Sequence, residues 1–144
     1  MRHHHEPTNL LVYGAPDDIW ADGKTLTVVD YKATASKDRI ITLDSVYRQA
    51  YKRQVEVYQW LLRQKGFAVS SKGFLLFANA RVDRQSFHSR LDFDMQLVGV
   101  IGQTDWIEPM LSQIKACLMS EQPPKPAADC EACKFVAAVN RAVA

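Results

Sequence analysis

Two carboxylates and a lysine lie close together near the start of this 144-residue chain. Asp17 follows Gly14 by three residues, and Asp30 and Lys32 end the segment Leu26-Thr-Val-Val-Asp-Tyr-Lys. Carboxylate oxygens are the ligands that magnesium and manganese prefer, and such ions keep several waters. A metal-bound water beside a lysine could hydrolyse a phosphodiester, because the ion polarises the phosphoryl oxygen and the lysine orients or deprotonates the water or stabilises the developing charge.

The two carboxylates are expected on adjacent strands of one hairpin. Residues 10–13 form an apolar run, residues 17–21 continue this strand after a bend at 14–16, and residues 26–31 are rich in β-branched side chains. Asp22-Gly23 between them is a strong hairpin signal. An antiparallel pairing around this turn places Asp17 opposite residues 28–30, within reach of Asp30.

Alternation along the second strand sorts its polar groups. Asp30 and Lys32 leave one face, whereas Tyr31 points to the other and leaves its carbonyl free as an oxygen ligand. Asp18 is expected to face away from Asp17, as a solvent-facing or turn-capping carboxylate. An isolated Asp-x-Lys pair is usually a surface ion pair, but the preceding Gly-x-x-Asp favours a metal site.

The next segment, about residues 45–65, has helical periodicity. Tyr51, Gln54, Tyr58 and Leu62 share one face. An unpaired buried amide costs about 1–3 kcal/mol, so Gln54 is expected to face a polar site rather than a closed core. A basic stripe beside this face is a candidate contact for DNA phosphates, or a solvated face; it comprises Arg48, Lys52 and Arg63.

The remaining pattern predicts further strands and helices around the same sheet. Strands are expected at residues 73–79 and 86–94, with 96–101 as an extension, and His88 lies on the polar face of the second. A helix capped by Thr104 is expected to run to about residue 120, and a short helix at 134–143 follows a proline-rich connector. The order predicts an α/β fold.

Composition indicates an ordinary globular domain. With 47% hydrophobic and 24% charged residues, the chain can build one core, and the net charge of +2 leaves any polyanion site to a local patch. No apolar run has the length of a membrane span, and no signal peptide is visible, so a cytoplasmic setting is expected. Residues 1–9 are expected to form an N-terminal tail, and 10–144 a single domain.

Three motifs in this order resemble the PD-(D/E)XK nucleases. They are Gly14-x-x-Asp17, Val28-Val-Asp30-Tyr31-Lys32 and Gln54-x-x-x-Tyr58, and the similarity is strongest to the RecB-like branch, which includes CRISPR-associated exonucleases. The resemblance implies a restriction-endonuclease-like mixed β-sheet flanked by helices. It also implies Mg²⁺- or Mn²⁺-dependent hydrolysis of DNA, with exonuclease action favoured, in repair, recombination, phage or CRISPR processes alongside helicases or other repair proteins.

Carried over position by position, the resemblance assigns roles to the candidate residues. Asp17, Asp30 and the Tyr31 carbonyl would be metal ligands, and Lys32 the catalytic lysine. Gln54 would organise the site or contact DNA near the scissile phosphate, supported by Tyr58.

The cysteines depart from the pattern of that branch. Its members often end in Cys-x-x-Cys with further cysteines that together hold an iron–sulfur cluster, which needs four ligands. This chain has one cysteine besides Cys130 and Cys133, namely Cys117, and Cys117 is expected to be a small buried hydrophobe. A complete cluster is therefore not expected, and the pair reads as a vestigial iron–sulfur or zinc site.

Two other readings remain open from the residues alone. A non-catalytic DNA-binding or assembly module could keep the same fold. A thiol or zinc protein built around Cys130 and Cys133 would predict bound zinc or a reactive thiol. The number of metal ions, the strandedness of the substrate and the oligomeric state are not specified by the sequence.

Overall fold

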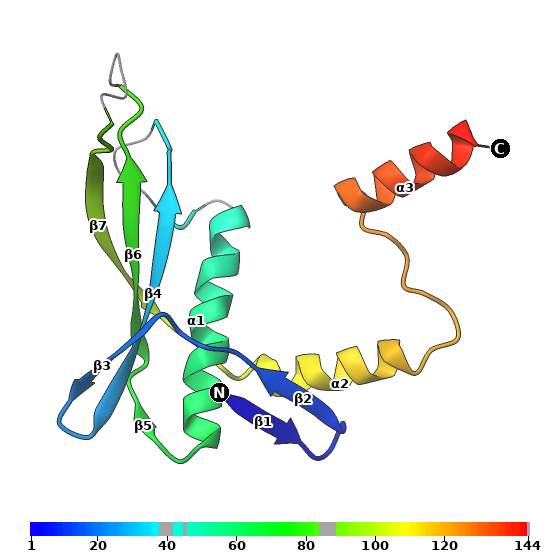
Figure 1. Ribbon diagram of the computed structural model, residues 1–144. Helices are drawn as coiled ribbons and strands as arrows, with labels where there is room; N and C mark the ends of the chain where they lie inside the picture. The colour runs from blue at the N-terminus through cyan, green and yellow to red at the C-terminus, as the bar shows by residue number, and fades with distance from the viewer. Residues whose placement is uncertain (38–41, 45, 84–88, 144) are drawn as a thin grey trace.

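A computed structural model of the chain describes residues 1–37, 42–44, 46–83 and 89–143. One long helix lies against a twisted sheet, a small hairpin and a second helix lie near one end of it, and a third helix stands apart (Figure 1). In chain order the elements are β1 (Arg2–His5), β2 (Leu10–Tyr13), β3 (Asp18–Asp22), β4 (Thr25–Thr34), α1 (Val46–Gln64), β5 (Ala68–Val69), β6 (Lys72–Ala80), β7 (Phe93–Ile101), α2 (Ile107–Leu118) and α3 (Glu131–Ala142).

The main sheet is mixed and has five strands. Its order is β3-β4-β6-β7. The short β5 pairs with the start of β4, at Thr25 and Leu26, and β6 pairs with the rest of that strand. The β3–β4 and β6–β7 pairs are antiparallel, whereas β4 and β6 are parallel. Parallel neighbours need a long crossover, which α1 supplies between β4 and β6. This arrangement confirms the α/β, restriction-endonuclease-like fold expected from the sequence.

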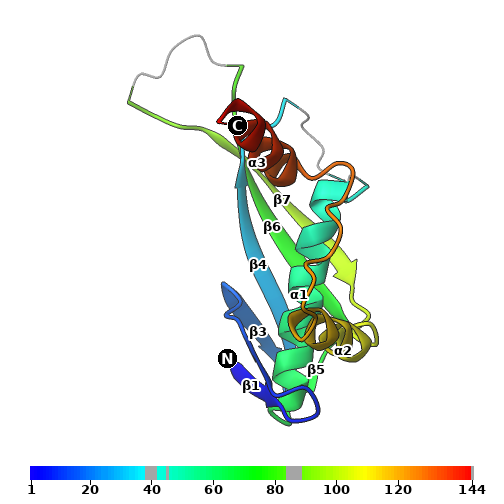
Figure 2. The ribbon, with the colours of Figure 1, turned by 90° about the vertical axis from the view of Figure 1, so that its right-hand side faces the viewer.

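The main core lies between α1 and one face of this sheet. Val28 from β4, Leu75 and Phe77 from β6, and Val55 and Leu62 from α1 are buried together. Figure 2, which looks onto α1, shows the helix running along the strands with α2 crossing near its lower end. The strand residues that alternate with these core residues point to the other face of the sheet, away from α1, where Tyr31, Met95 and Leu97 are exposed.

Several predicted elements agree with the structure. Residues 10–13 form β2, the helix predicted at 45–65 is α1, and the strand predicted at 73–79 is β6. The Asp22-Gly23 hairpin forms with the expected register, since Asp18 pairs with Val29 and Asp22 with Thr25. Gly23 has a φ of 57°, which glycine adopts at little steric cost.

The N-terminal tail predicted for residues 1–9 is wrong. Arg2–His5 is a strand that pairs antiparallel with β2. His5 is buried, its Nδ1 lies 2.7 Å from Thr8 Oγ1, and its Nε2 lies 2.5 Å from Glu108 Oε2 in α2. The polar, histidine-rich sequence suggests a tail, but Glu108 of α2 and Thr8 give the buried His5 ring its polar partners.

Two details of the C-terminal half are also corrected. The strand predicted at 86–94 is wrong, because β7 begins at Phe93 and residues 89–92 precede it outside any strand; 84–88, including His88, lie outside the described residues. Helix α2 begins at Ile107 after Trp106, with no side-chain cap, so Thr104 is not its N-cap. The Thr104 hydroxyl instead lies 3.2 Å from Arg63 Nη1.

Helix α3 is more exposed than the other described elements, because each of those has at least one buried or half-buried residue and α3 has none. Within Glu131–Ala142, all of which the structure describes, no residue is buried. Figure 1 shows it separated from α1 and the sheet at the end of an extended connector.

Candidate active site

The site is centred on β4, where Asp30 and Lys32 point toward α1. Asp30 is 1% exposed, and the Lys32 ammonium donates to its carboxylate. Lys32 Nζ also donates to Gln54 Oε1 at 3.0 Å and lies 5.0 Å from the centre of the Tyr51 ring. The lysine is therefore held from three sides, by β4 and by two residues one turn apart on α1.

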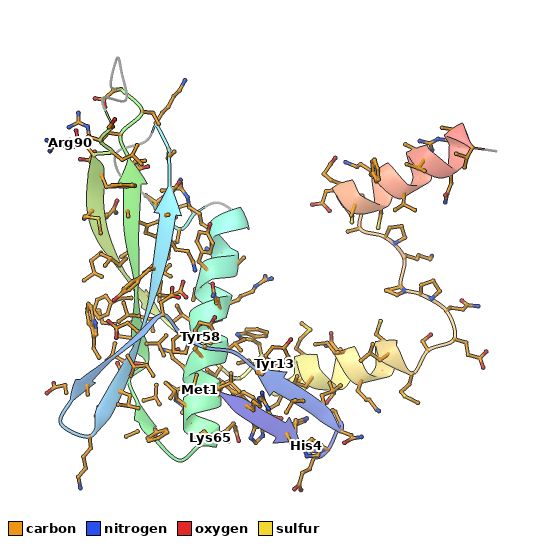
Figure 3. The ribbon with its side chains drawn as sticks, in the orientation of Figure 1. Met1, His4, Tyr13, Tyr58, Lys65 and Arg90 are labelled. Carbon is orange, nitrogen blue, oxygen red and sulfur yellow. The ribbon has the colours of Figure 1, made fainter. Side chains whose placement is uncertain are left out.

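Gln54 connects the lysine to a tyrosine and, through it, to the chain before β3. Gln54 Nε2 donates to Tyr58 Oη at 2.8 Å. A Cβ placed on Gly14 would lie 2.7 Å from Tyr58 Cε1, closer than real Cβ contacts. Gly14 therefore lets the chain pass against Tyr58, which Figure 3 labels on α1 where the segment between β2 and β3 crosses it.

Asp17, three residues after Gly14, lies at the edge of β4. Its Oδ2 accepts from the Tyr31 backbone N–H at 2.7 Å. The β3–β4 pairing ends at Asp18 and Val29, and extending that register by one residue puts Asp17 opposite Asp30. Because the N–H and C=O of a strand residue point to the same side, the Tyr31 carbonyl is also directed to the edge where Asp17 lies.

The two carboxyls interact electrostatically. Burial raises the pKa of Asp30 above its usual value, and the negative charge of Asp17 raises this pKa further, whereas Lys32 lowers it. A buried carboxylate beside a second carboxylate is stabilised by additional positive charge. This electrostatic environment suits a divalent cation.

The donor set tests whether a metal ion fits. Among the described residues no group of three His, Cys, Asp or Glu side chains converges on one point. Any ion would therefore be held by Asp17, Asp30 and the Tyr31 carbonyl, with water completing its shell. Mg²⁺ tolerates this arrangement, because it is often bound through one or two carboxylates and keeps several waters.

Asp18 has a separate role that spacing did not reveal. Its Oδ1 accepts from the Ile19 N–H at 2.7 Å, and its Oδ2 accepts from Tyr31 Oη at 2.7 Å and from Trp20 Nε1 at 3.1 Å. The bond from Tyr31 lowers the pKa of Asp18, and the same bond raises the pKa of Tyr31. Asp18 therefore anchors the Tyr31 side chain on the sheet face opposite α1, and only the fold identifies this pairing.

The predicted basic stripe lies away from Lys32. Arg63 is nine residues from Gln54, which at 100° per residue places it on the opposite side of α1. Its guanidinium donates to Thr104 Oγ1 and to the carbonyls of Val69 and Ser70. Arg48 donates to the Thr42 carbonyl, and Lys52 Nζ lies 3.8 Å from Glu56 Oε1. These contacts give all three side chains partners within the protein.

The cysteines lie far from β4 along the chain. Cys130 precedes α3, and its sulfur accepts from the Cys133 N–H at 3.5 Å. This bond lowers the pKa of the Cys130 thiol, while hydrogen bonding to Cys130 raises that of Cys133. Cys117, expected to be buried, is exposed on α2. No third His, Cys, Asp or Glu completes a metal site with Cys130 and Cys133 in the described part of the chain.

The family comparison agrees with this geometry. The family model of the PD-(D/E)XK nuclease superfamily matches residues 3–138. The chain belongs to this superfamily. No significant match is found among curated proteins. Superfamily membership implies nuclease activity that uses a divalent metal.

None of the helices in the described ranges combines the length and apolar character that a membrane crossing requires.

Proposed function

We propose that this PD-(D/E)XK protein is a Mg²⁺- or Mn²⁺-dependent deoxyribonuclease that hydrolyses DNA phosphodiester bonds. The observation that carries the proposal is the convergence of Asp17, Asp30 and the Lys32–Gln54 pair at one edge of β4. Three elements distant in sequence supply these groups: the segment before β3, β4 itself, and α1.

Each residue has a distinct part in the proposed reaction. Asp17, Asp30 and the Tyr31 carbonyl would hold a divalent metal ion, which when bound would supply polarisation of the phosphoryl oxygen and a lower pKa for a bound water. Lys32 places positive charge where negative charge develops on the phosphorane. Gln54 keeps the ammonium in place through its Oε1, and Tyr58 fixes the amide in turn. Because these contacts preexist, little reorganisation is needed during the reaction.

The finer assignment rests on the order of the motifs. Gly14-x-x-Asp17, Asp30-x-Lys32 and Gln54-x-x-x-Tyr58 support the RecB-like branch and favour exonuclease action. We place the protein in the cytoplasm, in DNA repair, recombination, phage or CRISPR-related processing, with helicases or other repair proteins as partners. Contacts of Arg48, Lys52 and Arg63 with DNA belong to this proposal as weaker elements, since each already has a partner within the protein.

The proposal is tested with purified protein on end-labelled DNA in Mg²⁺, Mn²⁺ or EDTA. Cleavage should require the metal and should fall by about 10³-fold or more in Asp30→Ala, the range for loss of a principal catalytic group. Asp22→Ala, which removes an exposed carboxylate at the end of β3, is the matched control and should cleave normally. Circular dichroism verifies that both variants fold.

Two outcomes would contradict the proposal. DNA binding without metal-dependent cleavage would instead identify a non-catalytic DNA-binding or assembly module. Cleavage unchanged by Asp30→Ala would exclude this site as the catalytic centre. Circular single-stranded DNA separates the two modes of attack, because an exonuclease leaves it intact.

A further inference from the structure

A depression of about 400 Å³ adjoins the site on the sheet face opposite α1. Its volume is within the range of small-molecule pockets, roughly 300–1,000 Å³. Tyr31 from β4, Leu76 and Ala78 from β6, and Met95 from β7 supply much of its lining. Asp17 and Lys32 also line it; the Lys32 ammonium points to α1 on the other face, so it is Asp17, at the edge of β4, that the depression shares with the candidate metal site.

The lining of this depression is preformed and apolar. The Tyr31 hydroxyl donates to Asp18 Oδ2 at 2.7 Å, which anchors the ring, yet the residue remains 47% exposed. Met95 is 61% exposed and pairs directly with Ala78 across the β6–β7 ladder. A fixed aromatic ring beside a thioether and short aliphatic side chains is a surface on which a flat, uncharged ring can stack.

The shared residue indicates which part of a substrate this surface contacts. Asp17 lies at the edge of β4, where the two faces of the sheet meet, so a phosphate bound there through a metal would have its own nucleotide next to the depression. The sugar–phosphate backbone is charged and gains little from the apolar lining, whereas a nucleobase has a π-face that stacks on aromatic and apolar groups.

We propose that this depression binds an unpaired nucleobase beside the scissile phosphate, so that the substrate is single-stranded DNA or a frayed end. The inference rests on the proposed nuclease function and adds the strandedness of the substrate. In a duplex the same base is paired and stacked, and it reaches a pocket only after unstacking, which costs a few kcal/mol. Single strands present their bases without that cost.

Binding in EDTA tests the pocket separately from catalysis. Fluorescence anisotropy compares oligodeoxythymidine with an abasic oligomer of the same length and the same number of phosphates. The wild-type protein should bind the abasic strand about tenfold more weakly, consistent with stacking of one base. Equal affinities for the two oligomers would overturn the inference.

Two variants on β7 provide a matched pair. Met95→Glu places a charge in the depression and should remove the preference for bases. Leu97→Glu places the same charge two residues along the same face of β7, at a side chain that does not line the depression, and should keep the preference. Loss of the preference in both variants or in neither would contradict the assignment. Both positions are exposed, so folding should persist, as circular dichroism can verify.

Cleavage assays then separate the two proposals. With Mg²⁺ or Mn²⁺, a single strand should be cut about tenfold faster than a duplex of the same sequence. Metal-dependent cleavage at equal rates on both substrates would overturn the base pocket and leave the nuclease proposal intact. Absence of cleavage on either substrate would overturn the nuclease proposal, while the anisotropy comparison would still decide whether the depression binds bases.

Discussion

The β4–α1 unit and the C-terminal segment from residue 119 onward both carry residues that suggest chemistry, but their environments differ. In β4, Val28, Val29 and Asp30 are at most 1% exposed, and Lys32 is held by Asp30 and Gln54. In α3, no residue is buried, and Phe135 is 69% exposed. Within the part of the chain that the structure describes, Cys130 and Cys133 therefore have only their own helix to position them, although the family match covers both regions.

This difference shows that a sequence motif forms a functional site only where the fold adds further groups to it. Asp30-x-Lys32 alone would be a surface ion pair. It becomes a candidate catalytic centre because a buried strand fixes its direction, and a helix and a neighbouring loop add Gln54 and Asp17. The Cys-x-x-Cys motif also has side chains that can bind a metal, but no third His, Cys, Asp or Glu joins it in the described part of the chain.

Removing the charge of Lys32, the proposed catalytic lysine, should have the largest effect. Lys32→Met keeps the aliphatic stem, and cleavage should fall by about 10³-fold or more because the positive charge beside the reacting phosphate is lost. Mn²⁺ binding, followed by electron paramagnetic resonance, should persist through Asp17 and Asp30. Lys24→Met in the exposed hairpin turn is the control. Activity of Lys32→Met within tenfold of wild type would show that the lysine is not catalytic.

Crowding the crossing between the β2–β3 segment and α1 should have a smaller effect. Gly14→Ala places a Cβ 2.7 Å from Tyr58 Cε1 and should lower the free energy of unfolding by about 1–3 kcal/mol. It should also slow cleavage, because Tyr58 holds Gln54 and Gln54 holds Lys32. Urea denaturation and initial rates measure the two effects.

Gly99→Ala is the comparison for that experiment. Its added Cβ would meet the flexible end of Lys72 at 3.1 Å, so relief is easy and the loss of stability should be smaller. Combining Gly14→Ala with Tyr58→Ala should cost less than the sum of the single variants, since the clash is then absent. Additive costs would show that Tyr58 is not the obstacle.

The cysteine pair should show a modest difference in reactivity. The Cys133 N–H lowers the pKa of the Cys130 thiol, whereas the pKa of Cys133 is raised. A lower pKa means a larger thiolate fraction at neutral pH, so Cys130 should react severalfold faster with iodoacetamide. The test uses Cys117→Ser protein with either Cys130→Ser or Cys133→Ser. Equal rates, or a faster Cys133, would contradict the local geometry at the start of α3.

Removing α3 should have the smallest effect. Deletion of residues 120–144 should change the free energy of unfolding by no more than about 0.5 kcal/mol and leave cleavage unchanged, because α3 buries no residue. Leu75→Ala, which truncates a fully buried side chain, should cost about 2–5 kcal/mol in the same denaturation experiment. A large loss on deletion would mean that α3 packs against the body in solution.

Much of the fold was predictable because local patterns are strong there. The β-branched run ending at Tyr31 predicts β4, and the three- and four-residue spacing from Tyr51 to Leu62 predicts α1. The Asp22-Gly23 turn predicts the hairpin that joins β3 to β4. The failures come where a distant partner decides. His5 belongs to a strand because β2 and Glu108 satisfy it, and Thr104 contacts Arg63 instead of capping α2.

The sequence by itself determined the candidate residue types and the alternation that puts Asp30 and Lys32 on one face, since a strand has a period of two. It also indicated the superfamily. The sequence favoured Asp17 over Asp18 as the ligand, but only the tertiary structure showed what each contacts: Asp17 accepts from the Tyr31 backbone, and Asp18 accepts from the Tyr31 hydroxyl. Only the fold showed that Gly14 is needed against Tyr58, and that an apolar depression adjoins the site. The physical reason is that these contacts join segments far apart in the chain, and local spacing carries no information about such distances.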